Sequence, residues 1–136
     1  MTSPNGKETE VPLGAGEVIL VVEDQTLVRE MTKATLEYLN YRVIAVRNGR
    51  EALKAYGSHR DKIALVLTDM VMPDMGGGEL IGILKQATPE LRVMVMSGYA
   101  LGDTEEIVLP PGIAGYLQKP VVLEQLAQVI SGVLGP

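Results

Sequence analysis

Acidic residues follow two apolar segments that have the character of buried strands, and they are the residues of this chain best suited to chemistry. Asp69 ends the apolar run that begins at Ile63, and Glu23 and Asp24 follow the run Val18–Val22. If both strands end at the same edge of a sheet, three carboxylates meet there. Such a cluster is costly unless a cation shares it, because two carboxylates about 4 Å apart repel by about 4 kcal/mol at an effective dielectric constant of about 20.

Two further polar residues follow later strand-like segments. Ser97 comes after Val93-Met-Val-Met, and Lys119 comes after Tyr116-Leu-Gln. A carboxylate can attack phosphorus as a nucleophile, and Mg²⁺ takes carboxylate and phosphate oxygens as ligands. An ammonium and a hydroxyl group can bind the oxygens of a phosphoryl group during its transfer. The side chains at these strand ends therefore indicate transfer of a phosphoryl group to Asp69 with the help of Mg²⁺.

Each of these residues also has a simpler interpretation when it is taken alone. Asp69 and Asp24 can cap a loop or a helix, Ser97 can be a turn residue, and Lys119 can be a solvated surface charge. The occurrence of a suitable group at four strand ends in chain order is what favours a shared site.

Apolar segments alternate with stretches of helical periodicity along the chain. The expected strands are Val18–Val22, Arg42–Val46, Ile63–Thr68, Arg92–Met96 and Gly115–Leu117, and the expected helices span residues 28–39, 49–56, 78–86 and 123–133. The fourth crossover, Leu101–Leu109, contains Gly102 and precedes Pro110-Pro111-Gly112, so that at most about two turns of helix fit there. This alternation predicts right-handed βαβ units and a parallel sheet in an α/β fold.

Composition sets limits on the class of protein. The chain has 136 residues, of which 46% are hydrophobic, and this fits one folded domain at residues 17–136 after a flexible leader at residues 1–16. The net charge of −5 argues against direct nucleic-acid binding. The absence of Cys excludes disulfides and thiol catalysis. With no signal peptide and no apolar stretch of about 18 residues, we expect a cytoplasmic domain without a membrane span.

The motifs at the strand ends carry a family resemblance. Val-Val-Glu23-Asp24, Leu-Thr-Asp69-Met-Val-Met-Pro73, Met-Ser97-Gly-Tyr and Leu-Gln-Lys119-Pro120 occur in this order. Over about Gly16 to Leu134 the chain resembles the receiver domains of two-component response regulators. The resemblance implies a flavodoxin-like, doubly wound (βα)5 fold whose parallel five-stranded sheet has the strand order 2-1-3-4-5.

The resemblance also implies a role for each residue of the site. Asp69 would accept a phosphoryl group from a phosphohistidine on a histidine kinase or a histidine phosphotransfer protein. Mg²⁺ would be held by Asp24 and Asp69 directly, by Glu23 through water, and by the backbone carbonyl of Val71. The side chains of Ser97 and Lys119 would bind phosphate oxygens.

A conformational switch belongs to the same expectation. Ser97 would shift toward the phosphate and Tyr116 would turn inward behind it, which would change the surface made by the fourth crossover, the fifth strand and the last helix. The Lys119–Pro120 peptide bond would be cis, which is uncommon enough to be a sharp test. We expect a monomer or a weak dimer.

Some stretches are most similar to receivers that are joined to hybrid histidine kinases. These are Leu67-Thr-Asp-Met-Val-Met-Pro73 and Met-Ser97-Gly-Tyr-Ala100. If this similarity holds, the leader would be the linker that follows a kinase domain.

Two alternative functions remain open at this level. A haloacid-dehalogenase-like phosphatase also uses a nucleophilic Asp with Mg²⁺, but it carries a second Asp two residues later, where this chain has Val71. A receiver-shaped interaction module that never carries phosphate would not need Asp24, Asp69, Ser97 and Lys119 to be intact. Because Val71 and Tyr99 offer no obvious group to activate water, we expect at most slow self-dephosphorylation.

Overall fold

The strands form one parallel sheet in the predicted order. The computed structural model describes residues 11–98 and 109–135. Over these residues the sheet has the order β2-β1-β3-β4-β5, and it consists of β1 (Val18–Val22), β2 (Arg42–Val46), β3 (Ile63–Asp69), β4 (Val93–Ser97) and β5 (Gly115–Gln118). The predicted α/β fold with strand order 2-1-3-4-5 is therefore confirmed. Residues 101–108 of the predicted fourth crossover lie outside the described part of the chain.

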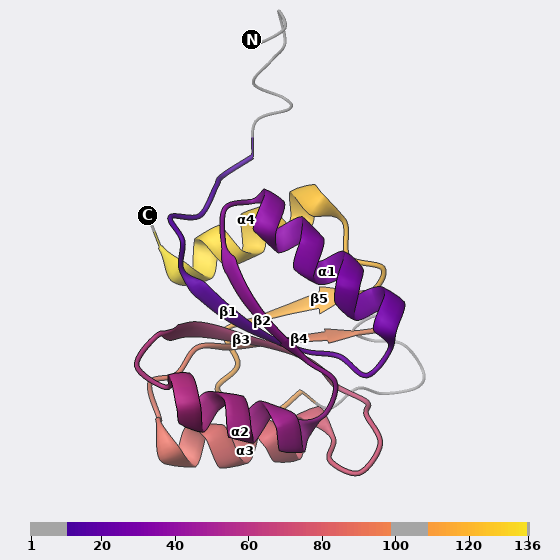
Figure 1. Ribbon diagram of the computed structural model, residues 1–136, viewed down its shortest axis with the longest axis vertical. Helices are drawn as coiled ribbons and strands as arrows, with labels where there is room; N and C mark the ends of the chain where they lie inside the picture. The colour runs from indigo at the N-terminus through magenta and orange to yellow at the C-terminus, as the bar shows by residue number, and fades with distance from the viewer. Residues whose placement is uncertain (1–10, 99–108, 136) are drawn as a thin grey trace, which may run out of the picture.

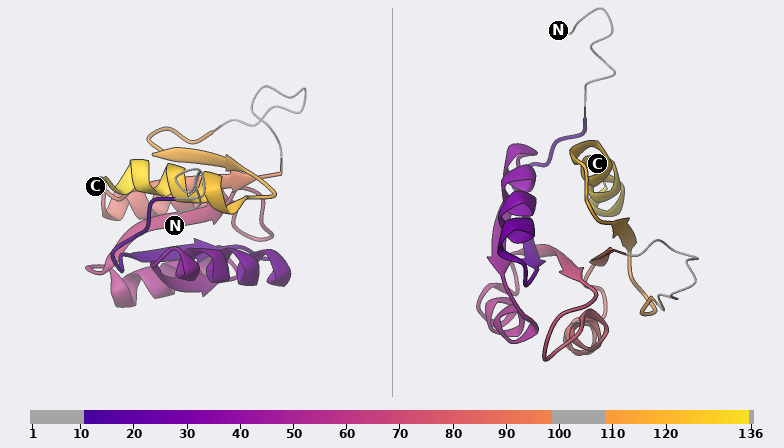
Figure 2. Two further views of the ribbon diagram at one scale, coloured as in Figure 1. Left: turned by 90° about the horizontal axis from the view of Figure 1, so that it is seen from above. Right: turned by 90° about the vertical axis from the view of Figure 1, so that its right-hand side faces the viewer.

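Helices cover both faces of this sheet. In Figures 1 and 2, α1 and α4 lie on one face and α2 and α3 lie on the other. The helices span α1 (Thr26–Tyr38), α2 (Gly49–His59), α3 (Gly77–Ala87) and α4 (Leu123–Leu134). Among the described residues, no helix is long and apolar enough to cross a membrane.

The central strands bury both of their faces, and this makes their ends rigid. Along β1, Ile19 and Val21 belong to the core under α1 and α4, whereas Leu20 and Val22 belong to the core under α2 and α3. This alternation follows from the two-residue period of a strand. All five residues of β4 are buried as well. The ends of these strands are therefore held by a close-packed core on both faces of the sheet, and the residues that follow them start from fixed positions.

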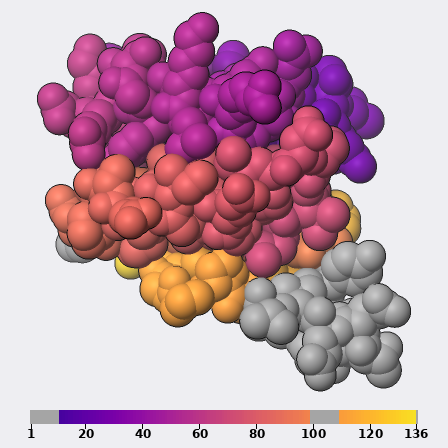
Figure 3. All heavy atoms as spheres, turned by 90° about the horizontal axis from the view of Figure 1, so that it is seen from below, coloured from indigo at the N-terminus to yellow at the C-terminus, as the bar shows by residue number. Residues whose placement is uncertain are grey.

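Residues 109–114, which precede β5, lie next to α3. Figure 3 shows residues that precede β5 next to α3 on the face covered by α2 and α3. The Nζ atom of Lys85 donates to the carbonyl oxygens of Leu91 at 3.1 Å and Gly112 at 3.3 Å. These bonds connect α3 to the chain just before β4 and just before β5.

Helix α2 ends later than its sequence predicts. The expected end was Tyr56, because Gly57-Ser-His resembles a loop, but the helix runs to His59. The Tyr56 hydroxyl donates to Thr88 Oγ1 at 2.5 Å, and Arg60 Nη2 donates to the Ala87 carbonyl at 3.1 Å. These contacts with the end of α3 outweigh the low helix propensity of glycine.

Part of the predicted leader contacts the domain. The N–H of Gly14 donates to the Leu39 carbonyl at 2.7 Å, and Asn40 Nδ2 donates to the Gly14 carbonyl at 2.6 Å. Val11 packs against the core beneath α1 and α4. A Cβ atom on Gly14 would overlap the ring of Tyr41. We therefore propose that the folded unit begins near Val11 rather than at residue 17.

Gly77 provides a test of how closely α3 approaches the end of β3. A Cβ atom at Gly77 would lie 2.5 Å from the Asp69 carbonyl oxygen, whereas a Cβ atom at Gly82 of the same helix would meet nothing within 4 Å. We expect Gly77→Ala to destabilise the protein by about 2 kcal/mol through backbone displacement. Gly82→Ala should stabilise it by about 1 kcal/mol through helix propensity. Urea denaturation measures both, and equal effects of the two substitutions would contradict this account.

Candidate functional site

The carboxyl ends of the central strands open into a cavity of about 760 Å³. The strand register explains why the predicted residues meet here. Val22 is the neighbour of Thr68, so Glu23 and Asp69 follow at the same level of the sheet, and Ser97 ends β4 beside Gln118. The cavity is lined by Asp24, Gln25, Asp69, Val71, Met72, Pro73, Ser97, Gly98 and Lys119.

Three carboxylates form the centre of this site. One oxygen from each of Glu23, Asp24 and Asp69 lies within 4.8 Å of the other two. Glu23 is fully buried and Asp69 is 5% exposed, so water screens little of their repulsion. Three carboxylate oxygens at this spacing could hold a metal ion.

Lys119 reaches the same carboxylates from the end of β5. Its Nζ atom lies 2.7 Å from Glu23 Oε1 and 3.2 Å from Asp69 Oδ2. The Lys119–Pro120 peptide bond is cis, as the family resemblance implies. With three carboxylates and one ammonium group, two negative charges in the cluster remain unbalanced. A divalent cation has the charge that this cluster lacks.

The pKa values of Glu23, Asp69 and Lys119 agree with this excess of negative charge. Burial raises the pKa of Glu23 and of Asp69, and this effect exceeds the opposing influence of Lys119 on each carboxyl group. Burial alone would lower the pKa of Lys119, but the hydrogen bond with Glu23 and the charge of Asp69 raise it overall. The lysine therefore stays charged, while the carboxylates are only partly compensated.

Both carboxylate oxygens of Glu23 have partners within the protein. The Oε2 atom accepts a hydrogen bond from the Gln25 N–H at 3.0 Å. The Oε1 atom is buried and lies 2.7 Å from the Nζ atom of Lys119. Hard divalent cations take carboxylate oxygens as ligands, so the residues present fit such an ion.

The remaining predicted residues lie around this cluster. Ser97 is 1% exposed and contributes to the cavity wall. A hydrogen bond from the backbone N–H of Val71 lowers the pKa of Asp69, although burial outweighs it. Tyr116 is half-buried on β5 and packs against the core beneath α2 and α3. The structure thus brings Glu23, Asp24, Asp69, Val71, Ser97 and Lys119 together. It places Tyr116 on β5, with β4 between it and the strand that ends in Asp69.

Sequence reasoning missed residues that support the site through the backbone. Gln25 contributes its N–H to Glu23, Thr68 donates through its hydroxyl to the Asp69 carbonyl at 2.9 Å, and Arg29 donates to the Glu23 carbonyl at 2.9 Å. The position of Gln25 immediately after the acidic pair was the only available signal. The contacts of Thr68 and Arg29 carry no recognisable spacing.

Comparison with known proteins identifies the family. The model of the response regulator receiver domain matches residues 19–131, which is most of the chain. The chain belongs to the response regulator receiver domain family.

Individual relatives agree with this assignment. The sensor kinase CckA of Brucella abortus is 30% identical over 127 residues, which are 93% of this chain but only 13% of the kinase. The polar-differentiation response regulator DivK of Brucella anthropi is 31% identical over 120 residues, covering 86% of this chain and 95% of that protein. The crystal structure of a receiver domain protein from Clostridium thermocellum has a TM-score of 0.78 and 28% identity, covering 86% of this chain and 93% of that one.

These similarities do not favour the two alternative functions. Neither an aspartyl-phosphate phosphatase nor a phosphorylation-independent interaction module is what the matching family model describes. The chain spans 13% of the sensor kinase it matches and 95% of DivK, so its relatives include proteins much longer than this chain and proteins of similar length.

The crowding of carboxylates predicts that Asp69→Asn stabilises the metal-free protein. The amide keeps the shape of the side chain and removes one charge from the cluster, which we expect to contribute about 1 kcal/mol. The raised pKa values of Glu23 and Asp69 mean that the folded chain binds more protons than the unfolded chain. The wild type should therefore lose stability as the pH rises above the ordinary Glu value of 4.5, and the variant should lose less.

Thermal unfolding in EDTA across this pH range measures both effects. Asp61→Asn, which changes an exposed carboxylate, serves as the control and should leave stability unchanged. A lower melting temperature for Asp69→Asn than for the wild type would contradict the repulsion described above.

Proposed function

We propose that this domain is a phosphoacceptor in a two-component phosphorelay and that Asp69 receives the phosphoryl group. The observation that carries the proposal is the meeting of three carboxylates within 4.8 Å, with Lys119 3.2 Å from Asp69, at the edge of an open cavity. A buried nucleophile, a cation site and a fixed ammonium group are the parts that phosphoryl transfer requires.

Mg²⁺ is the proposed metal ion. Asp24 and Asp69 would bind it directly, the Val71 carbonyl would contribute a backbone ligand, and Glu23 would bind through water. When bound, Mg²⁺ supplies positive charge that offsets the charge on the phosphoryl oxygens during transfer. The proposal is supported by the three carboxylates that lie within 4.8 Å of one another, because the single ammonium group of Lys119 offsets only part of their charge.

The protein's own residues provide the nucleophile and two contacts for phosphate. A carboxylate oxygen of Asp69 would form the new O–P bond while the N–P bond of the phosphohistidine breaks, and the imidazole, which carries a proton on its other ring nitrogen, would leave as a neutral ring. Lys119 already lies beside Asp69 and would bind one phosphoryl oxygen. The Ser97 hydroxyl, at the cavity wall, would donate to another.

The surface next to the site suits the helix of a phosphodonor. A largely apolar groove of about 330 Å³ lies between α1 and the segment after β5, and its lining includes Gln25 and Lys119, which also line the cavity. Met31 is 61% exposed beside it. An amphipathic helix that carries the phosphohistidine would place its apolar side here. The proposed partners are accordingly a histidine kinase or a histidine phosphotransfer protein, in the cytoplasm.

A switch would connect the phosphorylated site to the surface of β5 and α4. Ser97 would move toward the phosphoryl group and Tyr116 would turn inward. The proposal is supported by the burial of Ser97 and by the pairing of β4 with β5, in which Val95 is the neighbour of Tyr116. The similarity to a sensor kinase also supports an origin in a hybrid histidine kinase.

Phosphorylation of Asp69 is directly testable. Acetyl phosphate with Mg²⁺ should add one phosphoryl group to the wild type and none to Asp69→Asn, because the amide is not a nucleophile toward phosphorus. Intact mass spectrometry measures the adduct, and EDTA should abolish it. The proposal would be wrong if the wild type gained no mass, or if both proteins gained the same mass.

Lys119→Ala separates metal binding from signal propagation. Removing the ammonium group leaves the three carboxylates, so Mg²⁺ should bind at least as tightly as in the wild type. Beryllofluoride, a mimic of the phosphoryl group, should then fail to shift the amide resonances of β5 and α4 in the variant. Lys33→Ala, which changes an exposed lysine paired with Glu37, is the control. Loss of Mg²⁺ binding in Lys119→Ala would refute the assigned role.

A further inference from the structure

Arg29 lies where a positive charge is not favoured by its helix. It is in the first turn of α1, and this turn contains no acidic residue. A cation near a helix N-terminus is opposed by the helix dipole, typically by about 0.3–1 kcal/mol. Another interaction must therefore hold the guanidinium group.

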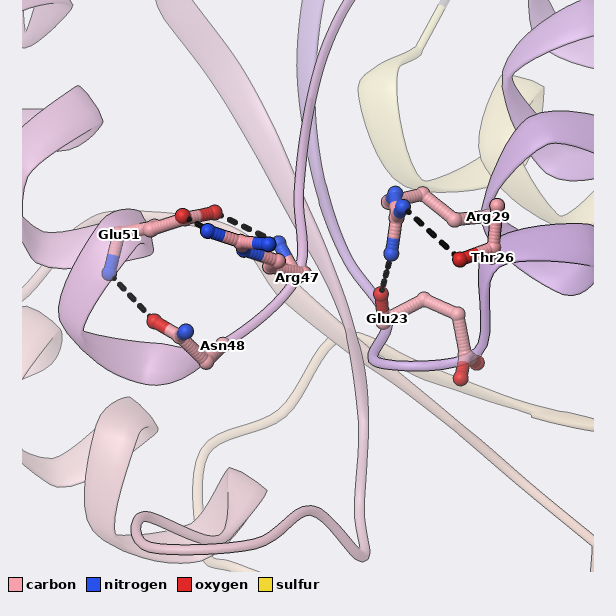
Figure 4. A network of polar contacts seen from close by, with 6 residues as sticks. All are labelled: Glu23, Thr26, Arg29, Arg47, Asn48 and Glu51. Atoms are coloured by element: carbon pink, nitrogen blue, oxygen red, sulfur yellow. Dashed lines mark hydrogen bonds and ion pairs between the residues drawn. The ribbon is translucent and has the colours of Figure 1, made fainter.

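That interaction is with the end of β1. Arg29 Nη1 donates to the backbone carbonyl of Glu23 at 2.9 Å, and Nη2 lies 3.4 Å from Thr26 Oγ1. Figure 4 shows the side chain of Arg29 reaching back over the first turn toward this carbonyl. The contact with Glu23 is partly buried, and a hydrogen bond from a charged donor is stronger than one between neutral groups.

Glu23 is thereby held at every polar group. Its N–H donates to the Val46 carbonyl at 3.0 Å, its Oε2 atom accepts from Gln25, and its Oε1 atom pairs with Lys119. The bond from Arg29 to the carbonyl completes this set. Because a peptide unit is planar, fixing the carbonyl of Glu23 also fixes the direction in which the chain continues to Asp24.

The position of the Asp24 carboxylate depends on this backbone more than the positions of the Glu23 and Asp69 carboxylates do. The carboxylates of Glu23 and Asp69 are each paired with Lys119. Across the described residues, no hydrogen bond or ion pair holds the carboxylate of Asp24. The Cα atom of Asp24, from which its side chain starts, is placed by the peptide unit that Arg29 restrains.

We infer that Arg29 is a positioning residue for the cation site and acts on Asp24 through the carbonyl of Glu23. The inference rests on the proposed function of the three carboxylates as a Mg²⁺ site. Arg29 touches neither the cation nor the phosphoryl group in this assignment. Its role is to restrain one ligand before the metal ion arrives.

When Arg29 is replaced, the loss of its charge and the loss of its positioning contact should change the Mg²⁺ affinity in opposite directions. A positive charge near the site repels a metal ion, so loss of that charge alone would strengthen Mg²⁺ binding. Loss of a positioning contact would weaken it, and partners that orient metal ligands typically change metal affinity by about tenfold or more. The sign of the change therefore distinguishes the two effects.

The test compares Mg²⁺ affinities by following amide resonances during titration with MgCl₂. Arg29→Ala should bind Mg²⁺ about tenfold more weakly than the wild type. Arg29→Lys, which retains one donor on a long side chain, should recover part of the loss. The control is Arg47→Ala, which removes another arginine near the same edge of the sheet, one that pairs with Glu51 at 2.9 Å (Figure 4). Arg47→Ala should leave the Mg²⁺ affinity unchanged or slightly higher.

Each outcome bears on a separate claim. Equal or tighter binding by folded Arg29→Ala, when the wild type binds Mg²⁺, overturns the role of Arg29 and leaves the proposed function intact. Absence of Mg²⁺ binding in the wild type overturns the proposed function, and the role of Arg29 with it. If Arg29→Ala does not fold, Arg29→Gln takes its place, because its shorter side chain cannot span the same distance and should show the same loss.

Discussion

Repulsion among three carboxylates at one edge of the sheet is the constraint on which the rest of this structure depends. Glu23 and Asp69 are buried beside each other, and burial raises the pKa of both. One ammonium group, that of Lys119, offsets only part of this charge. The packed strands hold these like charges together, and a divalent cation with oxygen ligands would relieve their repulsion.

The parallel sheet supplies that rigidity. Helices cover both faces of the central strands, so that β1, β3 and β4 are anchored from two sides before their polar ends begin. The register places Asp69 beside Met96, and the N–H of Lys119 continues the ladder by donating to the Ser97 carbonyl at 2.6 Å. Carboxylates that follow β1 and β3 and an ammonium group that follows β5 thus meet directly at the ends of their strands.

Sequence patterns predicted the strands of the sheet and the site residues at the ends of those strands. Continuous Val, Ile and Leu runs predicted β1 and β3, and the residues after them proved to be neighbours because parallel strands end at one edge. Contacts between distant segments could not be predicted in the same way. The end of α2 depends on Thr88, and the bond of Gly14 to Leu39 has no local pattern. The contact of Arg29 could not be predicted from the sequence, because its partner is a backbone carbonyl group and every residue has one.

A crystal structure of the protein with Mg²⁺ and beryllofluoride tests the central claim most directly. The account predicts beryllium bonded to the Asp69 carboxylate, Mg²⁺ bound by Asp24, Asp69 and the Val71 carbonyl, and fluorine contacts from Ser97 and Lys119. Beryllofluoride on another carboxylate, or a metal ion bound away from the cluster of Glu23, Asp24 and Asp69, would contradict it.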